Sequence, residues 1–251
     1  MHDFGPVCYL DVQKTGSTFI SDFLARHMAS PALKFAKHAA INNLKSLNGK
    51  AFFISVRDPY AQYQSLYRYG LERSGGVSKR LRQNPQVDDA ALYCGGDEGF
   101  STWLRFVLDP AHHTILNANY PQHAALLFGF QTYRFLRLAL PNPKTLWPQM
   151  ENVDDVRRIF TEHRLYGEVI YQERLNADLM GLCTGTLAPF LKDKAAALAE
   201  LSAGATRINT TADQEFVADD DARQRIISRE WFLYEVLGYD APPPAPKASQ
   251  P

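Results

Sequence analysis

The 251-residue sequence has few cysteines, no excess of charge of either sign and no long apolar run. Its three cysteines are far apart and match no metal-ligand spacing, which argues against a metal site built on thiolates. Lys+Arg and Asp+Glu both total 27, so no global positive field attracts nucleic acid or an anionic membrane surface. An anionic ligand must therefore be held by a local cluster of positive groups.

Segments that direct a chain into or across a membrane are also missing from the sequence. No apolar run reaches the roughly 18 residues that a bilayer-spanning helix needs. The first residues lack the basic stretch and apolar core of a signal peptide, so we expect a cytoplasmic protein. What is present, 45% hydrophobic and 22% charged residues, is typical of a globular domain. Cys8 lies in an apolar run and is expected to be a small core residue.

Apolar residues alternate between strand-like runs and segments with helical spacing, which predicts an α/β fold. We expect a small central parallel sheet flanked by helices, with a helix-rich second half, in a single domain over residues 1–240. The expected strands are 7–12, 33–37, 51–56 and 167–171. The expected helices are 17–28, 39–47, 58–71, 99–108, 120–138, 152–160, 173–182, 187–201 and 219–237. The polar, glycine-rich stretch 74–99 is expected to be a loop, and the proline-rich tail 241–251 to be disordered.

The first expected strand ends in a tight turn and continues as a helix, an arrangement that predicts an anion site. The free N–H groups and the dipole at a helix N-terminus attract negative charge. The turn has the sequence QKTGST, and its expected ligand-binding residues are Gln13, Lys14, Thr15, Gly16, Ser17 and Thr18. Lys14 adds a full charge and Gly16 permits close approach of the backbone. The alternative is a capped helix that carries a surface lysine.

The turn does not fit an ATP- or GTP-binding loop. Such a loop has the pattern Gly-x-x-x-x-Gly-Lys-Ser/Thr, whereas here Lys14 precedes Gly16 and the earlier glycine is missing. The second buried strand ends in Arg57, where a kinase would place a magnesium-binding aspartate. The neighbouring Asp58 is explained as a helix N-cap followed by Pro59. A nucleotide kinase is therefore the less favoured enzyme class.

A second anion site is predicted where the strand 51–56 ends, in the stretch VRDPYAQYQSLY. Arg57 stands at the carboxyl end of the strand, the edge at which open α/β sheets bind ligands. Ser65 follows Asp58 by two helical turns and shares a face with the helix N-terminus. A guanidinium and a hydroxyl arranged in this way suit a phosphate. The alternative is a strand-end arginine paired with a carboxylate, together with an unrelated helical serine.

The two segments together resemble the PAPS-dependent sulfotransferase family, closest to its carbohydrate- and glycan-modifying branch. QKTGST is similar to the family's 5′-phosphosulfate loop, in which the lysine precedes the glycine, although Gln13 stands where proline is common. RDPYAQYQSLY is similar to the 3′-phosphate motif, in which serine follows arginine by eight residues. RINTT resembles a loop that covers the cofactor in this branch, which implies roles for Arg207, Asn209 and Thr210. VIYQERLNADL and the ending REWFLYEVLGY resemble further segments of the same branch.

The resemblance implies a P-loop-NTPase-like sulfotransferase fold and a specific chemistry. The donor would be 3′-phosphoadenosine 5′-phosphosulfate (PAPS), the product PAP, and no metal would be needed. Lys14 would stabilise the charge that develops on the bridging oxygen during in-line transfer. The acceptor would be a hydroxyl or amine of a carbohydrate, a glycolipid or another small molecule. The lack of a membrane anchor implies, by analogy, a bacterial enzyme.

The acceptor's proton requires a base, and His38 is the main candidate. It follows the expected strand 33–37, and an unperturbed histidine has a pKa suited to this work. The alternative is that His38 only caps the expected helix 39–47. Glu173 is the reserve candidate and Glu72 the third.

Other sequence features leave the acceptor and the partners open. Residues 74–150 resemble no known segment and are expected to form the acceptor side. A basic stretch after the second motif could steer an acidic glycan or be ordinary solvated surface; it consists of Arg68, Arg73, Lys79, Arg80 and Arg82. A non-catalytic nucleotide-binding protein is a further alternative. The oligomeric state is not indicated.

Overall fold

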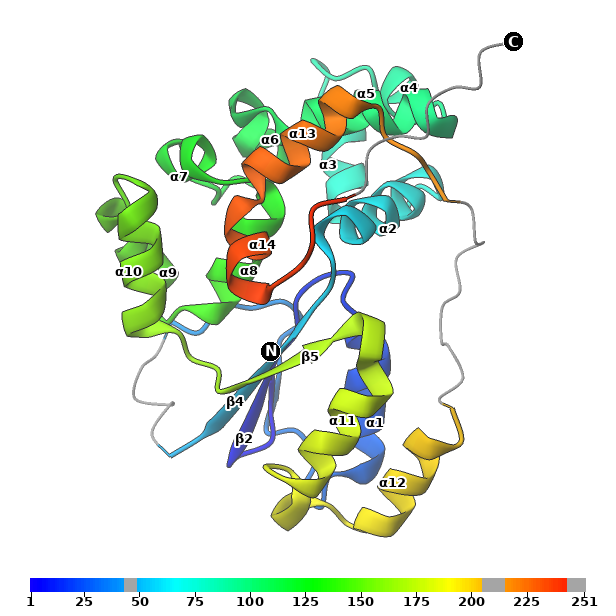
Figure 1. Ribbon diagram of the computed structural model, residues 1–251, viewed down its shortest axis with the longest axis vertical. Coiled ribbons are helices and arrows are strands. Elements are labelled where there is room, and N and C mark those ends of the chain that lie inside the picture. Colours follow the sequence, from blue (N-terminus) through cyan, green and yellow to red (C-terminus); the bar gives the residue numbers. More distant parts are fainter. Residues whose placement is uncertain (43–48, 205–214, 243–251) are drawn as a thin grey trace. The chain divides into compact units, whose positions relative to one another are not determined.

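The computed structural model describes residues 1–42, 49–204 and 215–242, and its α-helices and strands are shown in Figure 1. These residues form two compact units that interleave along the chain. The first unit takes Met1–Arg57, Arg134–Gln149 and the described part of 154–210. The second takes Asp58–Tyr133, Met150–Val153 and the described part of 211–251. The single domain over 1–240 stays a prediction, and the tail beyond residue 242 lies outside the described residues.

The first unit contains a five-stranded sheet of order β3-β1-β2-β4-β5. Its strands are β1 (His2–Asp3), β2 (Val7–Leu10), β3 (Lys34–Phe35), β4 (Ala51–Val56) and β5 (Glu168–Tyr171). β4 pairs in parallel with both β2 and β5, but β1 runs antiparallel to β2 and β3. The expectation of a parallel sheet was therefore wrong, and the sheet is mixed. The cause is β1, a strand of two residues that is too short to show a hydrophobic period.

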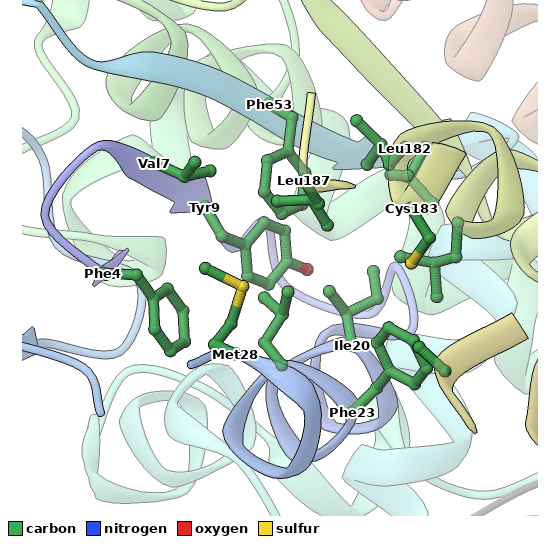
Figure 2. Close-up of a cluster of buried hydrophobic side chains, with 14 of the residues drawn as sticks. Phe4, Val7, Tyr9, Ile20, Phe23, Met28, Phe53, Leu182, Cys183 and Leu187 are labelled. Atoms are coloured by element: carbon green, nitrogen blue, oxygen red, sulfur yellow. The ribbon is translucent and has the colours of Figure 1, made fainter. Parts of the chain in front are cut away.

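The core of the first unit lies between the central strands and the helices that pack on them. All four residues of β2 are buried, and so are five of the six residues of β4. Such continuous apolar runs are typical of strands covered on both faces. Helix α1 (Ser17–His27) buries Phe19, Ile20, Phe23 and Leu24 against them (Figure 2). Cys8 is buried, as predicted.

Besides α1, the helices of the first unit are α9 (Pro143–Leu146), α10 (Val153–His163), α11 (Leu175–Thr184) and α12 (Lys194–Ser202), with 3-10 turns η3 (Trp147–Gln149), η4 (Gln172–Arg174) and η5 (Ala188–Phe190). Four helices of this unit overlap predicted ones: α1 and α12 are shorter than expected, α10 is longer and α11 is shifted by two residues, whereas α9 was not predicted. Helix α8 (Phe130–Ala139) begins in the second unit and continues into the first. Residues 39–42, which were expected to start a helix, are not helical. The rest of that expected helix, residues 43–47, lies outside the described residues.

The second unit is helical in the part of the chain that the structure describes. Its helices are α2 (Pro59–Leu71), α3 (Gly76–Gln83), α4 (Asp89–Leu92), α5 (Gly96–Leu108), η2 (Pro110–His112), α6 (His113–Leu116), α7 (Gln122–Leu127), α13 (Asp220–Arg229) and α14 (Trp231–Leu237). The expected loop 74–99 was therefore wrong, since it contains α3, α4 and the start of α5. Val77 and Leu81, one helical turn apart, are buried and hold α3 in place. Asp58 caps α2 as predicted, because its Oδ1 accepts a hydrogen bond of 2.7 Å from Ala61 N.

The predicted closing helix is broken at Glu230, which separates α13 from α14. The three residues around the break bind the ends of two other helices. The Arg229 guanidinium donates to the carbonyl oxygens of Leu126 and Phe128 at 3.1 and 2.9 Å, where α7 ends. Trp231 Nε1 donates to the Leu127 carbonyl at 2.9 Å. The buried Glu230 carboxylate accepts hydrogen bonds at the start of α8. Positive charge thus meets a helix C-terminus and negative charge an N-terminus.

No helix within the described residues combines the length and the apolar character that crossing a lipid bilayer requires.

Candidate functional site

The turn between β2 and α1 has an unusual backbone. Lys14 has a φ of 65° and Gly16 a φ of 79°, both in the left-handed region, while Thr15 between them does not. Alternation of this kind turns successive N–H groups toward one side and forms a concavity that binds anions. Lys14 is a non-glycine residue, so this conformation has a steric cost that the surrounding structure must offset.

Helix α1 starts at this turn without a side-chain cap. Its N-cap residue is Gly16, and no side-chain hydrogen bond to the first turn is found in the described residues. By contrast, aspartate side chains cap the N-termini of four other α-helices: α2, α4, α12 and α13. The first N–H groups of α1 are therefore left for a ligand or solvent, since they have no partner within the helix. Together with the turn, they form a donor surface for an anion.

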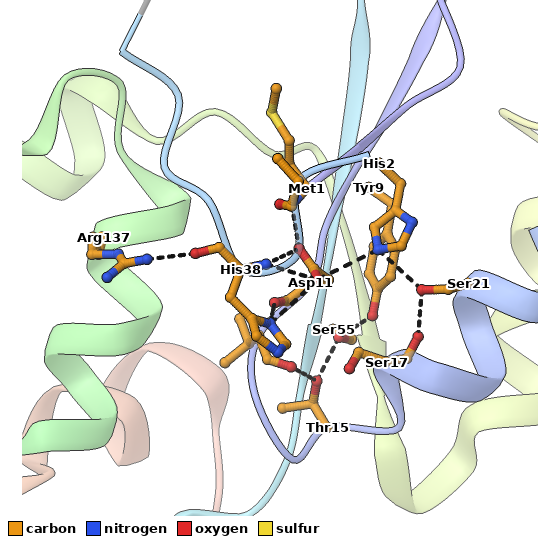
Figure 3. Close-up of polar contacts among 12 residues, drawn as sticks. Met1, His2, Tyr9, Asp11, Thr15, Ser17, Ser21, His38, Ser55 and Arg137 are labelled. Carbon is orange, nitrogen blue, oxygen red and sulfur yellow. Dashed lines mark hydrogen bonds and ion pairs between the residues drawn. The ribbon is translucent and has the colours of Figure 1, made fainter. Parts of the chain in front are cut away.

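Thr15 holds the turn in place through a chain of buried hydroxyl groups (Figure 3). Its Oγ1 donates to the Val12 carbonyl at 2.8 Å and lies 2.6 Å from Ser55 Oγ, which lies 2.6 Å from the Tyr9 hydroxyl. Each hydroxyl carries one proton, and a carbonyl can only accept. Thr15 must therefore accept from Ser55, and Ser55 from Tyr9. The Thr15 hydroxyl, which the sequence assigned to the ligand, is used within the protein.

The other side chains of the turn differ in their environment. Ser17 is buried, and Gln13, Lys14 and Thr18 are half-buried. No hydrogen bond from the hydroxyl of Ser17 or Thr18 is found among the described residues. These two hydroxyl groups therefore remain candidates for ligand contact, whereas the hydroxyl proton of Thr15 is already donated to Val12 and the binding role of Thr15 stays a prediction.

The two residues of the predicted 3′-phosphate site fall in different units. Arg57 is half-buried and follows the last residue of β4 in the first unit. Ser65 is buried in α2 of the second unit. Arg57 follows Ser55 by two residues, and Ser55 binds Thr15 of the turn. The end of β4 and the turn after β2 are thus joined, and the role of Ser65 stays a prediction.

His38 is held against Asp11, the residue that follows β2. The His38 main-chain N–H lies 3.1 and 3.0 Å from the two carboxylate oxygens of Asp11. Its ring Nδ1 lies 2.6 Å from the Asp11 carbonyl oxygen and 3.2 Å from Oδ2. The Arg137 guanidinium donates to the His38 carbonyl at 2.5 Å. His38 therefore does not serve as the cap of a helix at Ala39, because residues 39–42 are not helical.

Charge and burial shift both ionisable groups of this contact. Burial lowers the pKa of His38 below its ordinary 6.5, although Asp11 acts in the opposite direction. Burial alone would raise the pKa of Asp11, but a hydrogen bond from His2, the Met1 amino group and His38 lower it to about 2. At neutral pH the pair is therefore a carboxylate beside a neutral imidazole.

The other predicted residues are the two alternative bases and the three residues of the late loop. Glu173 is exposed in the 3-10 turn η4, and Glu72 is exposed at the end of α2 in the second unit. Arg207, Asn209 and Thr210 lie outside the described residues. In the described ranges, no group of three or more His, Cys, Asp or Glu side chains could hold a metal ion.

Three residues with a part in this region were missed in the sequence: Asp11, Ser55 and Arg137. The sequence did indicate that Asp11 is unusual, because it is a charged residue inside the apolar run VCYLDV, and charged residues are rare in strands buried on both faces. Ser55 had a similar, weaker signal inside AFFISV. Arg137 had none, because its contact with His38 joins residues 99 positions apart.

Comparison with known proteins gives no relative for the chain: no family model, curated protein or solved structure matches it. The geometry above and the motifs in the sequence are therefore the basis for a functional proposal.

Proposed function

We propose that the chain is a sulfotransferase that moves the sulfuryl group of PAPS to a hydroxyl or amine of a carbohydrate, glycolipid or other small acceptor. The observation that carries the proposal is the turn Lys14–Gly16. Its alternating backbone, the uncapped start of α1 and the Lys14 charge together form an anion site. The Lys-before-Gly order is that of a phosphosulfate loop, and it lacks the Gly-Lys order of an ATP-binding loop.

The two ends of the donor correspond to two parts of the first unit. The phosphosulfate would lie on the turn, within reach of the N–H groups of α1 and the hydroxyls of Ser17 and Thr18. Arg57, at the end of the neighbouring strand β4, would bind the 3′-phosphate as a charge-assisted donor. A side-chain contact supports placing the two anionic groups side by side: the buried hydroxyls of Thr15 and Ser55 link the turn to β4.

The reaction needs one base and one group that stabilises negative charge. The acceptor oxygen attacks sulfur, the bond from sulfur to the bridging oxygen breaks, and its electron pair stays on that oxygen as PAP leaves. Lys14 and the N–H groups of the turn stabilise this charge. The acceptor proton goes to His38, whose neutral ring is able to accept it.

Backbone strain is consistent with these roles. In the described residues four non-glycine positions have positive φ, and Lys14 and His38 are two of them. Residues held in such conformations concentrate at sites where the side chain or N–H must point in one direction. The two residues proposed for the chemistry are thus both held in a costly conformation.

The test is a comparison of ligands by thermal shift, followed by transfer of label. PAP is expected to raise the Tm by several degrees through preferential binding to the folded state, and Mg-ATP by much less. A large shift with Mg-ATP and none with PAP would favour the kinase alternative and overturn the proposal. Transfer of radiolabelled sulfate from PAPS to a panel of glycans and glycolipids then tests for chemistry. PAP binding without transfer to any acceptor would favour a non-catalytic nucleotide-binding protein.

A further inference from the structure

We propose that Asp11 is a positioning residue that holds His38 with its Nε2 atom as the proton acceptor, an inference that rests on the proposed function of His38 as the base. Asp11 belongs to no motif in the sequence. It follows β2 by one position, is fully buried, and contacts His38 from both its carboxylate and its main-chain carbonyl. The turn Lys14–Gly16 begins three residues later.

The backbone of His38 is fixed at both of its polar groups. Its N–H points between the two carboxylate oxygens of Asp11, at 3.1 and 3.0 Å. Its carbonyl oxygen accepts a hydrogen bond of 2.5 Å from Arg137. These contacts offset the cost of the left-handed conformation, in which His38 has a φ of 55°. The direction in which the side chain leaves the backbone is therefore determined by Asp11 and Arg137.

The ring of His38 is fixed as well, and its tautomer follows from the contact. Nδ1 lies 2.6 Å from the Asp11 carbonyl oxygen, which can only accept, so Nδ1 must carry the proton (Figure 3). A neutral imidazole has one N–H, which leaves Nε2 with a free lone pair. No partner of Nε2 is found in the described part of the chain. The ring therefore presents an unprotonated nitrogen away from Asp11.

The carboxylate also prepares the ring for its charged state. When Nε2 takes up a proton, the positive imidazolium lies 3.2 Å from Asp11 Oδ2, measured at Nδ1. Other charged or titratable groups also act on this pair. The Met1 amino group and His2 contact the Asp11 carboxylate, and Lys37 and Arg134 oppose a positive charge on His38. Asp11 is the one group among these that favours the protonated ring.

The substitution Asp11→Asn tests this role because it removes the charge and nearly preserves the shape. The Asp11 carbonyl remains, so the Nδ1–H tautomer has a partner, but the His38 N–H and the imidazolium lose their anion. We expect the pKa of His38 to fall below its wild-type value. Asp3→Asn is the matched control, because Asp3 pairs with Lys50 in the same unit and its carboxylate has no contact with His38 in the described residues.

The first measurement needs neither the sulfate donor nor the acceptor substrate. Nitrogen NMR of the free protein is expected to show Nδ1 protonated and Nε2 unprotonated in neutral His38, with the resonance assigned by its loss in His38→Gln. The pH midpoint of the His38 titration is expected to move to lower pH in Asp11→Asn and to be unchanged in Asp3→Asn. An Nε2–H tautomer, or an unchanged His38 titration in Asp11→Asn, would overturn the proposal. If PAPS yields no transfer, the proposed function fails while this measurement still decides the position of His38.

The second measurement is the pH profile of sulfate transfer. In Asp11→Asn the acid limb of kcat is expected at lower pH, and kcat on the plateau about 10²-fold lower, because the base is weaker and less well oriented. A purely structural role would lower the melting temperature without moving the acid limb, and that result would overturn the proposal.

A second variant keeps the proposal testable if Asp11→Asn does not fold. Arg137→Ala releases the His38 carbonyl and leaves the carboxylate in place. It is expected to lower kcat through loss of orientation, with PAP affinity unchanged. Equal kcat in Arg137→Ala and wild type would contradict the two-sided clamp on the His38 backbone.

Discussion

Glu230 accepts two hydrogen bonds from Thr132, one of 2.8 Å from the main-chain N–H and one of 2.7 Å from the hydroxyl. The same carboxylate accepts from Gln131 N at 3.1 Å and from the Tyr63 hydroxyl. These four hydrogen bonds satisfy the Glu230 side chain, which is 0% exposed, and none of the four donors is a basic group. The N–H groups at the start of a helix, which favour negative charge, take the place of a cation.

This contact predicts that Gly129→Ala is strongly destabilising. A Cβ at Gly129 would overlap Glu230 Oε1 and lie 2.6 Å from its Cδ and 3.1 Å from the Arg229 carbonyl oxygen. The carboxylate cannot retreat without losing its hydrogen bonds. We expect the free energy of unfolding to fall by about 3 kcal/mol or more, measured by urea denaturation.

The matched control for that substitution is Gly181→Ala in α11. In the described residues, no atom beyond the chain neighbours and the helix's own backbone lies within 4 Å of a Cβ at Gly181, and alanine favours a helix. We expect an unchanged or higher free energy of unfolding, by up to about 1 kcal/mol. Similar losses in both variants would show that the space beside Glu230 is not what restricts Gly129.

Thr15 and Thr18 are predicted to have different roles, Thr15 in stability and Thr18 in ligand binding. Thr15→Val removes the hydroxyl between Ser55 and the Val12 carbonyl, and should lower the free energy of unfolding by about 1–3 kcal/mol. Thr18→Val should leave stability nearly unchanged and weaken PAP binding about tenfold, through a lost hydrogen bond to an anion. Denaturation and calorimetry test the pair. Unchanged stability in Thr15→Val would contradict the closed hydroxyl chain.

Lys14→Ala is predicted to lower kcat for sulfate transfer about 10²- to 10³-fold. The substitution removes the charge that stabilises the departing oxygen and leaves the N–H groups of the turn in place. Lys144→Ala, an exposed lysine on α9 of the same unit, removes a charge of equal sign and should have wild-type activity. Equal activity in Lys14→Ala and Lys144→Ala would eliminate Lys14 from the chemistry.

Low pH is predicted to destabilise the protein because it protonates the Asp11 carboxylate. Its pKa in the folded state is about 2, below the ordinary 3.8, so the unfolded chain binds protons more readily. The resulting stability is present above about pH 4 and is lost as the pH falls toward 2, with an amplitude of about 2 kcal/mol. Denaturation at several pH values should show the stability gap between wild type and Asp11→Asn closing over this window. A gap independent of pH would contradict the low pKa.

The sequence predicted those parts of the fold whose structure is determined by local residues alone. β2 and β4 are buried almost throughout and consist mainly of apolar residues, and Asp58-Pro59 marks a helix start by local capping. β1 could not be predicted, because a strand of two residues is defined by its pairing partners and has no period of its own.

The breaks in the helices depend on distant contacts. The apolar spacing over α13 and α14 continues through Glu230, and nothing local indicates an interruption there. The break lies where the carboxylate reaches residues about 100 positions earlier. The same holds in the site: the loop that carries Lys14 was predictable from its order of residues, while the contacts of His38 with Asp11 and Arg137 were not.

The chain of hydroxyls from Tyr9 through Ser55 to Thr15 has a kinetic consequence. It ends on the Val12 carbonyl inside the protein, so these contacts hold the turn without help from an anion. Under the proposed function, an arriving ligand would meet N–H groups already in place and would have no loop to order, which removes one entropic cost of association. Encounter and orientation would set the rate of capture, as for a rigid receptor.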